Sequence, residues 1–249
     1  MSYFSQTDNP NTNSNYIFLA GAMVADIIAA QDFYGAPGAS TATAGNTTWG
    51  QGSNLGNFMD TIFSAMVAGT YTMAFTIYDQ GGIDTLNISY LDATEAANVN
   101  LQQGAYSDFG NEIGIMGIAI GTIVENLNSG AGNDTLIGSD AGNTIRGNQG
   151  NDSIEGNAGN DTLRGGDQFD TIRGGDGNDS IFGGNGRELV FGGNNDDIFI
   201  DNGQGAVLGN DTDFGGYVYD TLLARGGNDA MHGNAGNDSI EGGDGNDQL

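Results

Sequence analysis

The chain has 249 residues, with 45 glycines, 32 acidic residues, five arginines and a formal net charge of -27. So negative a chain excludes nucleic acid and anionic membrane surfaces as partners and favours cations. Without cysteine, neither disulfides nor a thiolate metal site can stabilise the fold. No run approaches the roughly 20 apolar residues that membrane insertion needs.

The N-terminal half predicts one short helix followed by short strands. In the helix at 23–35, Val24, Ile27 and Ile28 lie near one face, and Gly35 with the following proline ends it. Strand-like apolar runs follow at 71–79, 84–91 and 113–124. We expect these segments to form a small β-rich unit with an apolar core.

From Ser129 the chain follows a nine-residue period, in units such as "GNAGNDTLR" at 156–164. The period is interrupted at 201–214 and resumes at 215–249, where the last unit is incomplete. The eighth position is apolar in every unit, from Leu136 to Leu249. The Gly- and Asp-rich composition alone also allows a disordered, solvated segment. Such a segment has no reason to place an apolar side chain every ninth residue.

The sixth position of the units carries an acid with one exception, Asn143. These acids are Asp134, Asp152, Asp161, Asp170, Asp179, Glu188, Asp197, Asp220, Asp229, Asp238 and Asp247. Glycines at positions one, two and four allow a six-residue turn, and the last three residues make a short strand whose middle side chain points inward. Each unit is therefore half a coil, and the fold is predicted to be all-β, a parallel β-roll.

Stacked parallel strands lie about 4.8 Å apart, so the sixth-position carboxylates of units n and n+2 come within roughly 5 Å. Calcium takes oxygen ligands at about 2.3–2.6 Å and fits between two such groups, with turn carbonyls completing its shell. We therefore predict two columns of Ca²⁺ ions. Asn143 weakens its site by removing a charge, and the repeats are expected to unfold in a chelator because the carboxylates repel one another.

The repeat resembles the calcium-binding RTX nonapeptide, and several segments resemble the secreted serralysin-type (M10) zinc metalloproteases. "MSYFS" at 1–5 is similar to the Met-turn of that family, and "ADIIAAQDFYGA" at 25–36 to the helix that follows it. "TIYDQGGIDTLNIS" at 76–89 resembles the family's first calcium-binding segment. "GTIVENLNSGAGNDTLIG" at 121–138 resembles the start of its repeats.

The resemblance implies further calcium ligands outside the repeats. They are Gly45, Thr47, Asp79, Gly81, Gly82, Asp84 and Glu125. It also implies that Tyr3 is a zinc ligand, though only in a complete parent enzyme that holds Zn²⁺. Family members take three zinc ligands from histidines, whereas this chain has one histidine, His232, and no "HExxH" sequence. We expect this chain alone to be inactive as a protease.

The resemblance divides the chain into five parts. These are a protease-domain remnant at 1–40, a β-rich cap at 41–128, a β-roll at 129–200, the interruption at 201–214 and a second, truncated repeat block at 215–249. The N-terminus lacks a secretory signal peptide, and the resemblance implies an extracellular protein exported by a type I secretion apparatus. We expect an incomplete portion of such a protease that serves its calcium-triggered folding, stability and export. The alternative is a freestanding surface or adhesion protein that uses the roll as a spacer.

Overall fold

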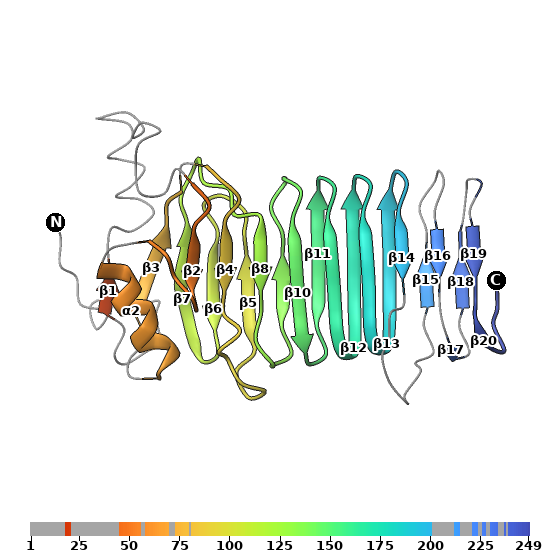
Figure 1. Cartoon of the computed structure of the whole chain (residues 1–249), viewed down its shortest axis with the longest axis horizontal. Helices are drawn as coiled ribbons and strands as arrows, with labels where there is room; N and C mark the ends of the chain where they lie inside the picture. The colour runs from red at the N-terminus through yellow and green to blue at the C-terminus, as the bar shows by residue number, and fades with distance from the viewer. Residues whose placement is uncertain are drawn as a thin grey trace.

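The computed structural model of the protein is a long stack of strands, with the helix α2 at one end and β19 at the other (Figure 1). It describes residues 18–20, 45–55, 58–69, 73–79, 81–200, 212–214, 221–223, 226–227, 230–233, 237 and 239–249. The helix expected at 23–35 lies outside these residues. No helix in the described part is long and apolar enough to cross a membrane.

The repeat region, with the end of the interruption, forms strands at the seventh to ninth positions as the period predicts. Four strands also extend into the expected turns, and two short ones lie wholly within them. The strands of this region are β9 (Thr135–Ile137), β10 (Thr144–Gln149), β11 (Ser153–Ala158), β12 (Thr162–Asp176), β13 (Ser180–Asn194), β14 (Ile198–Ile200), β15 (Thr212–Phe214), β16 (Thr221–Leu223), β17 (Gly226–Gly227), β18 (Ala230–His232), β19 (Ser239–Glu241) and β20 (Asp244–Gly245). Ile145 aligns with Leu163, and Leu163 with Ile181, so each unit pairs in parallel with the unit two places on. The all-β, parallel β-roll architecture is confirmed.

The N-terminal strands belong to the same stack. They are β1 (Phe18–Ala20), β2 (Thr48–Gly50), β3 (Met73–Ile77), β4 (Thr85–Asn87), β5 (Ala97–Asn100), β6 (Tyr106–Phe109), β7 (Glu112–Ile118) and β8 (Asn126–Asn128). Leu86 of β4 aligns with Leu127 of β8, which aligns with Ile145 of the repeats. In the other column, Val99 of β5 aligns with Leu136 of β9. The solenoid therefore begins before the first nonapeptide.

The interruption at 201–214 contributes a strand to the roll. Its last residues form β15, in which Asp213 pairs with Val190 on one side and Met231 on the other. In the second column Phe199 pairs with Leu222. The parallel stack therefore continues beyond the interruption.

The eighth-position side chains form one apolar column inside the roll. The residues from Leu127 to Ile172 at this position are completely buried, and Ile181, Val190 and Phe199 nearly so. Leu249, the last residue, is 66% exposed, because no further strand covers it in this chain. Each rung buries one aliphatic or aromatic side chain, so the core of the roll is narrow.

The same apolar core extends to α2 (Phe58–Val67), a helix that the sequence analysis did not single out. Phe63 lies edge-on between Trp49 and Phe75, with ring centroids 6.3 and 5.0 Å away. Leu55 donates its N–H to the Asp60 carboxylate, which fixes the start of the helix. The helix thereby covers one end of the solenoid.

Candidate calcium-binding ladders of the repeat

The sixth-position acids line both sides of the roll as ladders of buried carboxylates. Asp152, Asp161, Asp170 and Asp179 are each no more than 3% exposed. In each of these residues Oδ1 accepts the backbone N–H of the sixth-position residue 18 places earlier. For example, Asp179 Oδ1 accepts the N–H of Asp161 at 2.9 Å. This hydrogen bond orients each carboxylate toward the preceding coil of the roll.

The second oxygen of each carboxylate, Oδ2, accepts no hydrogen bond from the described residues. The Oδ2 atoms of Asp152, Asp161, Asp170 and Asp179 are buried and have no hydrogen-bond donor among the described residues. A buried polar atom without a partner costs roughly 1–3 kcal/mol, and more when it is charged. Four such atoms at one phase of the repeat therefore indicate that a proton or a cation completes them.

A glycine at the first position of each unit lies beside this oxygen. A β-carbon at Gly156 would come within 2.2 Å of Asp161 Oδ2 and 2.5 Å of the Gly174 carbonyl oxygen. At Gly174 the same atom would come within 2.2 Å of Asp179 Oδ2 and 2.4 Å of a backbone carbonyl. A carboxylate oxygen and a backbone carbonyl oxygen thus converge on a space that only glycine leaves free of side-chain atoms. Hard cations that prefer oxygen ligands, such as Ca²⁺, fit this donor set.

Burial disfavours the charge on these carboxylates. It raises the pKa of Asp152 to about 8, with Asp170 and Asp134 adding repulsion. It also raises the pKa of Asp161 to about 7, and that of Asp170 to about 7. The pKa of Asp134 and that of Asp179 are raised by the same burial. Near neutral pH the negative charge of these buried carboxylates must therefore be neutralised by protons or by a cation.

Most of the ligands that the family resemblance implied are brought together at the N-terminal end of one ladder. The Thr47 hydroxyl donates to Asp79 Oδ2 at 2.5 Å and to Asp84 Oδ1 at 3.0 Å. The N–H of Asp84 donates to Glu125 Oε2 at 2.7 Å, and that of Gly81 to Asp79 Oδ1 at 3.0 Å. Asp84 and Glu125 therefore continue the carboxylate-to-amide pattern of the repeats.

The N-terminal site resembles the repeat sites in its free oxygen and its glycines. Asp84 is completely buried, and its Oδ2 has no donor within the part of the chain that the structure describes. Burial raises the pKa of Asp84 to about 6, helped by repulsion from Asp79. A β-carbon at Gly82 would come within 2.6 Å of the Gly45 carbonyl group. An oxygen-binding cation such as Ca²⁺ would neutralise the buried Asp84 carboxylate here.

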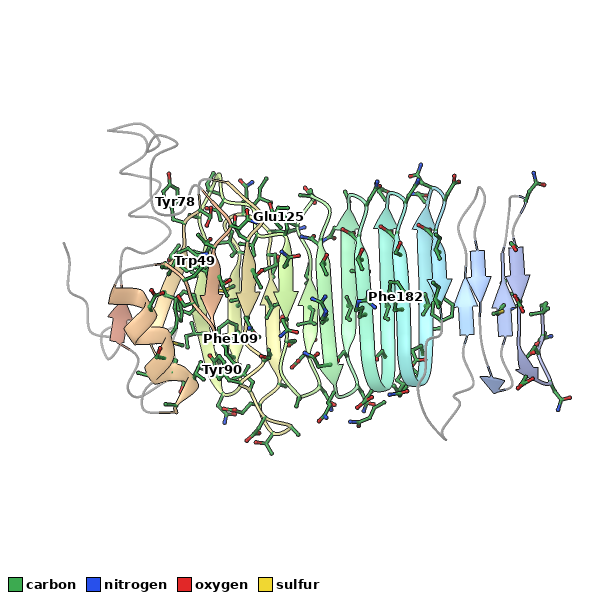
Figure 2. All side chains as sticks on the ribbon, in the orientation of Figure 1. Trp49, Tyr78, Tyr90, Phe109, Glu125 and Phe182 are labelled. Carbon is green, nitrogen blue, oxygen red and sulfur yellow. The ribbon has the colours of Figure 1, made fainter. Side chains whose placement is uncertain are left out.

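The remaining predicted ligands lie near the C-terminal end of the roll or outside the described residues. Glu188 and Asp197 are buried at the sixth position, and Asp247 lies near the end of the second block, where a β-carbon on Gly242 would meet its Oδ2 at 2.4 Å. Asp220, Asp229, Asp238 and Tyr3 lie outside the described residues. Glu125 is visible beside the N-terminal turns in Figure 2.

The sequence analysis missed the role of the first-position residue. It treated these glycines only as turn formers, although they also adjoin the carboxylates. The sequence carried a signal of this role, because every complete unit from Gly138 to Gly192 begins with glycine whereas the first begins with Ser129.

Among the described residues, no three His, Cys, Asp or Glu side chains cluster closely enough to hold a metal. A cation in the ladders would therefore depend on backbone carbonyls as much as on acids.

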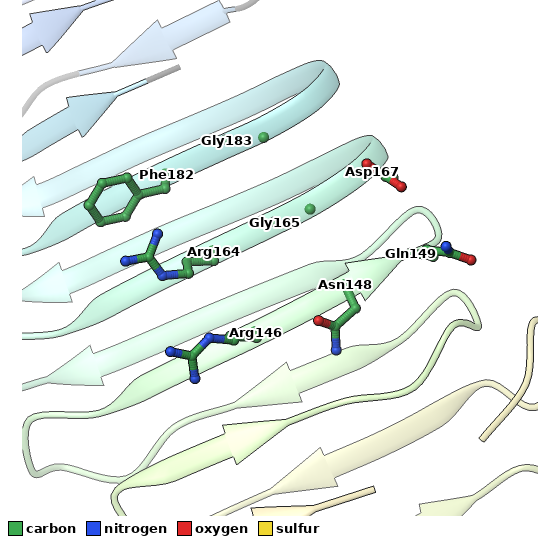
Figure 3. Close-up of a pocket in the computed structure, with 10 residues that line it drawn as sticks. Arg146, Asn148, Gln149, Arg164, Gly165, Asp167, Phe182 and Gly183 are labelled. Atoms are coloured by element: carbon green, nitrogen blue, oxygen red, sulfur yellow. The ribbon is translucent and has the colours of Figure 1, made fainter. Parts of the chain in front are cut away.

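The outer face of the roll also carries a shallow groove. It has a volume of about 380 Å³ and is lined by Arg146, Arg164, Asp167 and Phe182 (Figure 3). The Arg164 guanidinium lies over the Phe182 ring, 4.0 Å from its centroid, and Arg173 stacks on Phe191 in the other column. The same stacking in both columns indicates a structural role for these ninth-position side chains.

Comparisons with known proteins agree with this architecture. The family model described as "Peptidase M10 serralysin C terminal" matches residues 39–248. The chain is 36% identical over 149 residues to the metallopeptidase AprA of Pseudomonas marginalis, covering 57% of this chain and 29% of that protein. It is 38% identical over 145 residues to serralysin of Photorhabdus luminescens, covering 57% and 28%. Serralysin B of Dickeya chrysanthemi is 36% identical over 137 residues, covering 55% and 27%.

The matched region thus spans less than a third of the length of these relatives. The family match, in contrast, covers the N-terminal strands from β2 onward and the repeats. The chain belongs to the peptidase M10 serralysin C-terminal family.

Proposed function

We propose that this chain is the calcium-binding β-roll portion of a secreted serralysin-type zinc metalloprotease, and that calcium triggers its folding, stabilises it and supports its export. The observation that carries the proposal is the set of buried Oδ2 atoms of Asp152, Asp161, Asp170 and Asp179, each beside a glycine and a backbone carbonyl. Bound calcium supplies the positive charge that these groups lack. The relatives named serralysin and metalloprotease support the attachment to a protease.

The residues explain why folding should depend on the ion. Each rung of the roll buries one core side chain, such as Ile172, which contributes roughly 1.5–3 kcal/mol. Ordering the nine backbone residues of one unit costs on the order of 9–18 kcal/mol before hydrogen bonds offset part of it. The buried carboxylates add repulsion and desolvation at neutral pH. The roll should therefore fold only when the charge of the ladder carboxylates is neutralised.

The same dependence suits export. We infer that the repeats stay unfolded where calcium is scarce, pass unfolded through a type I secretion channel, and fold outside the cell. The zinc chemistry belongs to the protease part, because this chain has one histidine and the family uses three. Tyr3 would contribute to zinc only within that complete enzyme.

Calcium titration of the purified chain tests the proposal. Circular dichroism should report little β-structure in excess chelator and a cooperative gain at millimolar calcium. The double variant Asp161→Ala with Asp179→Ala should bind fewer ions and melt at a lower temperature. Identical spectra with and without calcium, or an unchanged ion count in the double variant, would refute calcium-dependent folding. Calcium binding at submicromolar concentration would refute the export argument, since the roll would fold inside the cell.

A further inference from the structure

The sixth-position side chains fall into two chemically different groups. In Asp152, Asp161, Asp170 and Asp179, one oxygen accepts a backbone N–H and the other has no donor in the described ranges. We refer to these as open rungs. In the first two units of the roll, which contain Asp134 and Asn143, the polar atoms of the sixth-position side chain are bonded within the protein. We refer to these as closed rungs.

Ser129 closes the first rung. It occupies the first position of its unit, where the open rungs carry glycine, and it is completely buried. Its hydroxyl donates a hydrogen bond to Asp134 Oδ2, while Asp134 Oδ1 accepts the N–H of Ala97 at 2.7 Å. Both carboxylate oxygens of Asp134 are therefore satisfied. The serine side chain occupies the space that a β-carbon would fill beside the other carboxylates.

Asn143 closes the second rung with its own amide. Its Nδ2 donates to the carbonyl oxygens of Val124 and Glu125 at 3.2 and 3.1 Å. Its Oδ1 accepts the N–H of Ser139 at 2.8 Å. Two carbonyls on one side and an N–H on the other fix the orientation of the amide, because the flipped amide would set oxygen against oxygen.

Asn143 also occupies the same position relative to the backbone as the acids do. A β-carbon at Gly138 would come within 2.5 Å of Asn143 Oδ1 and 2.5 Å of the Gly156 carbonyl oxygen. This arrangement repeats the one between Gly156, Asp161 and Gly174. The difference is chemical, because a neutral amide now donates N–H groups to backbone carbonyls and leaves no anionic charge to neutralise.

We propose that Ser129 and Asn143 replace the metal in the first two units of the roll, so that calcium loading of the repeats begins at Asp152 and Asp161. The proposal rests on the calcium-binding function proposed above and determines which sixth positions take an ion. It differs from the sequence prediction, in which Asn143 lines a weakened calcium site and Asp134 an ordinary one. The closed rungs connect the open ones to the N-terminal strands, since β8 and β5 pair directly with β10 and β9.

The experiment counts bound calcium ions by equilibrium titration and native mass spectrometry in four variants. Asn143→Asp should gain one ion, because an anionic oxygen would take the place of Nδ2 and face the carbonyls of Val124 and Glu125, to which the amide now donates. Ser129→Gly should also gain one ion, because it frees Asp134 Oδ2. Asn143→Ala should keep the wild-type count. Asp161→Asn, the matched control in an open rung, should lose one ion.

A second readout does not depend on counting. The dependence of the melting temperature on calcium concentration reports how many ions bind on folding. Its slope should rise for Asn143→Asp and Ser129→Gly, stay unchanged for Asn143→Ala and fall for Asp161→Asn. Loss of an ion in Asn143→Ala, or no gain in a folded Asn143→Asp or Ser129→Gly protein, would overturn the inference. A wild-type chain that binds no calcium would instead overturn the proposed function, and the two failures are therefore distinguishable.

Discussion

Asp161 and Asp179 are linked by a hydrogen bond from the backbone N–H of the first to Oδ1 of the second, at 2.9 Å and 18 residues apart. The bond holds the Asp179 carboxylate against the preceding coil and directs its Oδ2 toward Gly174. Because the same contact recurs between Asp152 and Asp170, one carboxylate per unit is both a structural acceptor and a candidate calcium ligand. The predictions below separate these two roles.

The first prediction concerns the glycine beside the carboxylate. In Gly156→Ala, the new methyl group would lie 2.2 Å from Asp161 Oδ2, so it should displace the ion and remove one calcium from the total. At calcium 100-fold above the dissociation constant, one lost site costs about 2.7 kcal/mol of unfolding free energy. Thermal melting at several calcium concentrations measures it. Gly69→Ala is the control for the ion count, since its added methyl meets nothing within 4 Å. Its φ of 66° makes the alanine backbone strained, so its melting temperature should fall at every calcium concentration while the ion count stays unchanged. An unchanged count in Gly156→Ala would show that the ion does not lie beside this glycine.

The second prediction concerns pH in excess chelator. The pKa of Asp152 is raised from 3.8 to about 8, and that of Asp161 and of Asp170 to about 7. Because the folded state binds these protons more tightly, their stabilising effect is complete below pH 3.8 and is lost as pH rises through 7 to 8. The ion-free roll should therefore retain more β-structure at about pH 5.5 than at about pH 9.

Asp161→Asn provides the control for this pH dependence, since it removes one titrating group and should flatten the profile. With calcium present the trend should reverse, because ions compete with protons and the apparent affinity rises with pH. Circular dichroism in chelator and in calcium across this pH range measures both. Greater ion-free β-structure at the higher pH would contradict the prediction.

The third prediction concerns the arginine–aromatic stacks. Arg164→Ala removes a guanidinium that lies 4.0 Å from the Phe182 ring centroid, and it should lower the unfolding free energy by about 0.5–1 kcal/mol. Chemical denaturation in saturating calcium measures the change, and the ion count should not alter. Arg146→Ala, which removes an exposed arginine from the same face, should have a smaller effect. An equal or larger loss in Arg146→Ala would show that the stacking contributes little.

The fourth prediction concerns the apolar column. Ile172 is completely buried in the middle of the roll, so Ile172→Ala should cost about 2–5 kcal/mol and raise the calcium concentration needed for folding. The matched control is Ile198→Ala, whose side chain is 42% exposed and should have little effect. Calcium titrations followed by circular dichroism compare the two. If both variants needed the same calcium concentration as the wild type, core burial would not be coupled to ion binding.

The sequence by itself determined the architecture of the repeats. The nine-residue period has glycine at the turn positions and an apolar side chain at the eighth position. This pattern predicts a roll in which alternate units pair in parallel. Ile145, Leu163 and Ile181 align in this way. The period also identified the sixth-position acids, because alternate units stack and residues at one phase therefore form two columns, one on each side of the roll.

Only the tertiary structure decided how those acids are used. Asp134 and Asn143 have partners inside the repeats, Ser129 and Ser139. Their other partners, Ala97, Val124 and Glu125, precede the first nonapeptide. The N-terminal site likewise joins Thr47, Asp79 and Asp84 with Glu125 across irregular connections. Hydrogen bonding depends on positions and directions within a few tenths of an ångström, which residue spacing alone does not fix. The period therefore predicted where carboxylates gather, and the folded backbone determined which of them retain an oxygen for a cation.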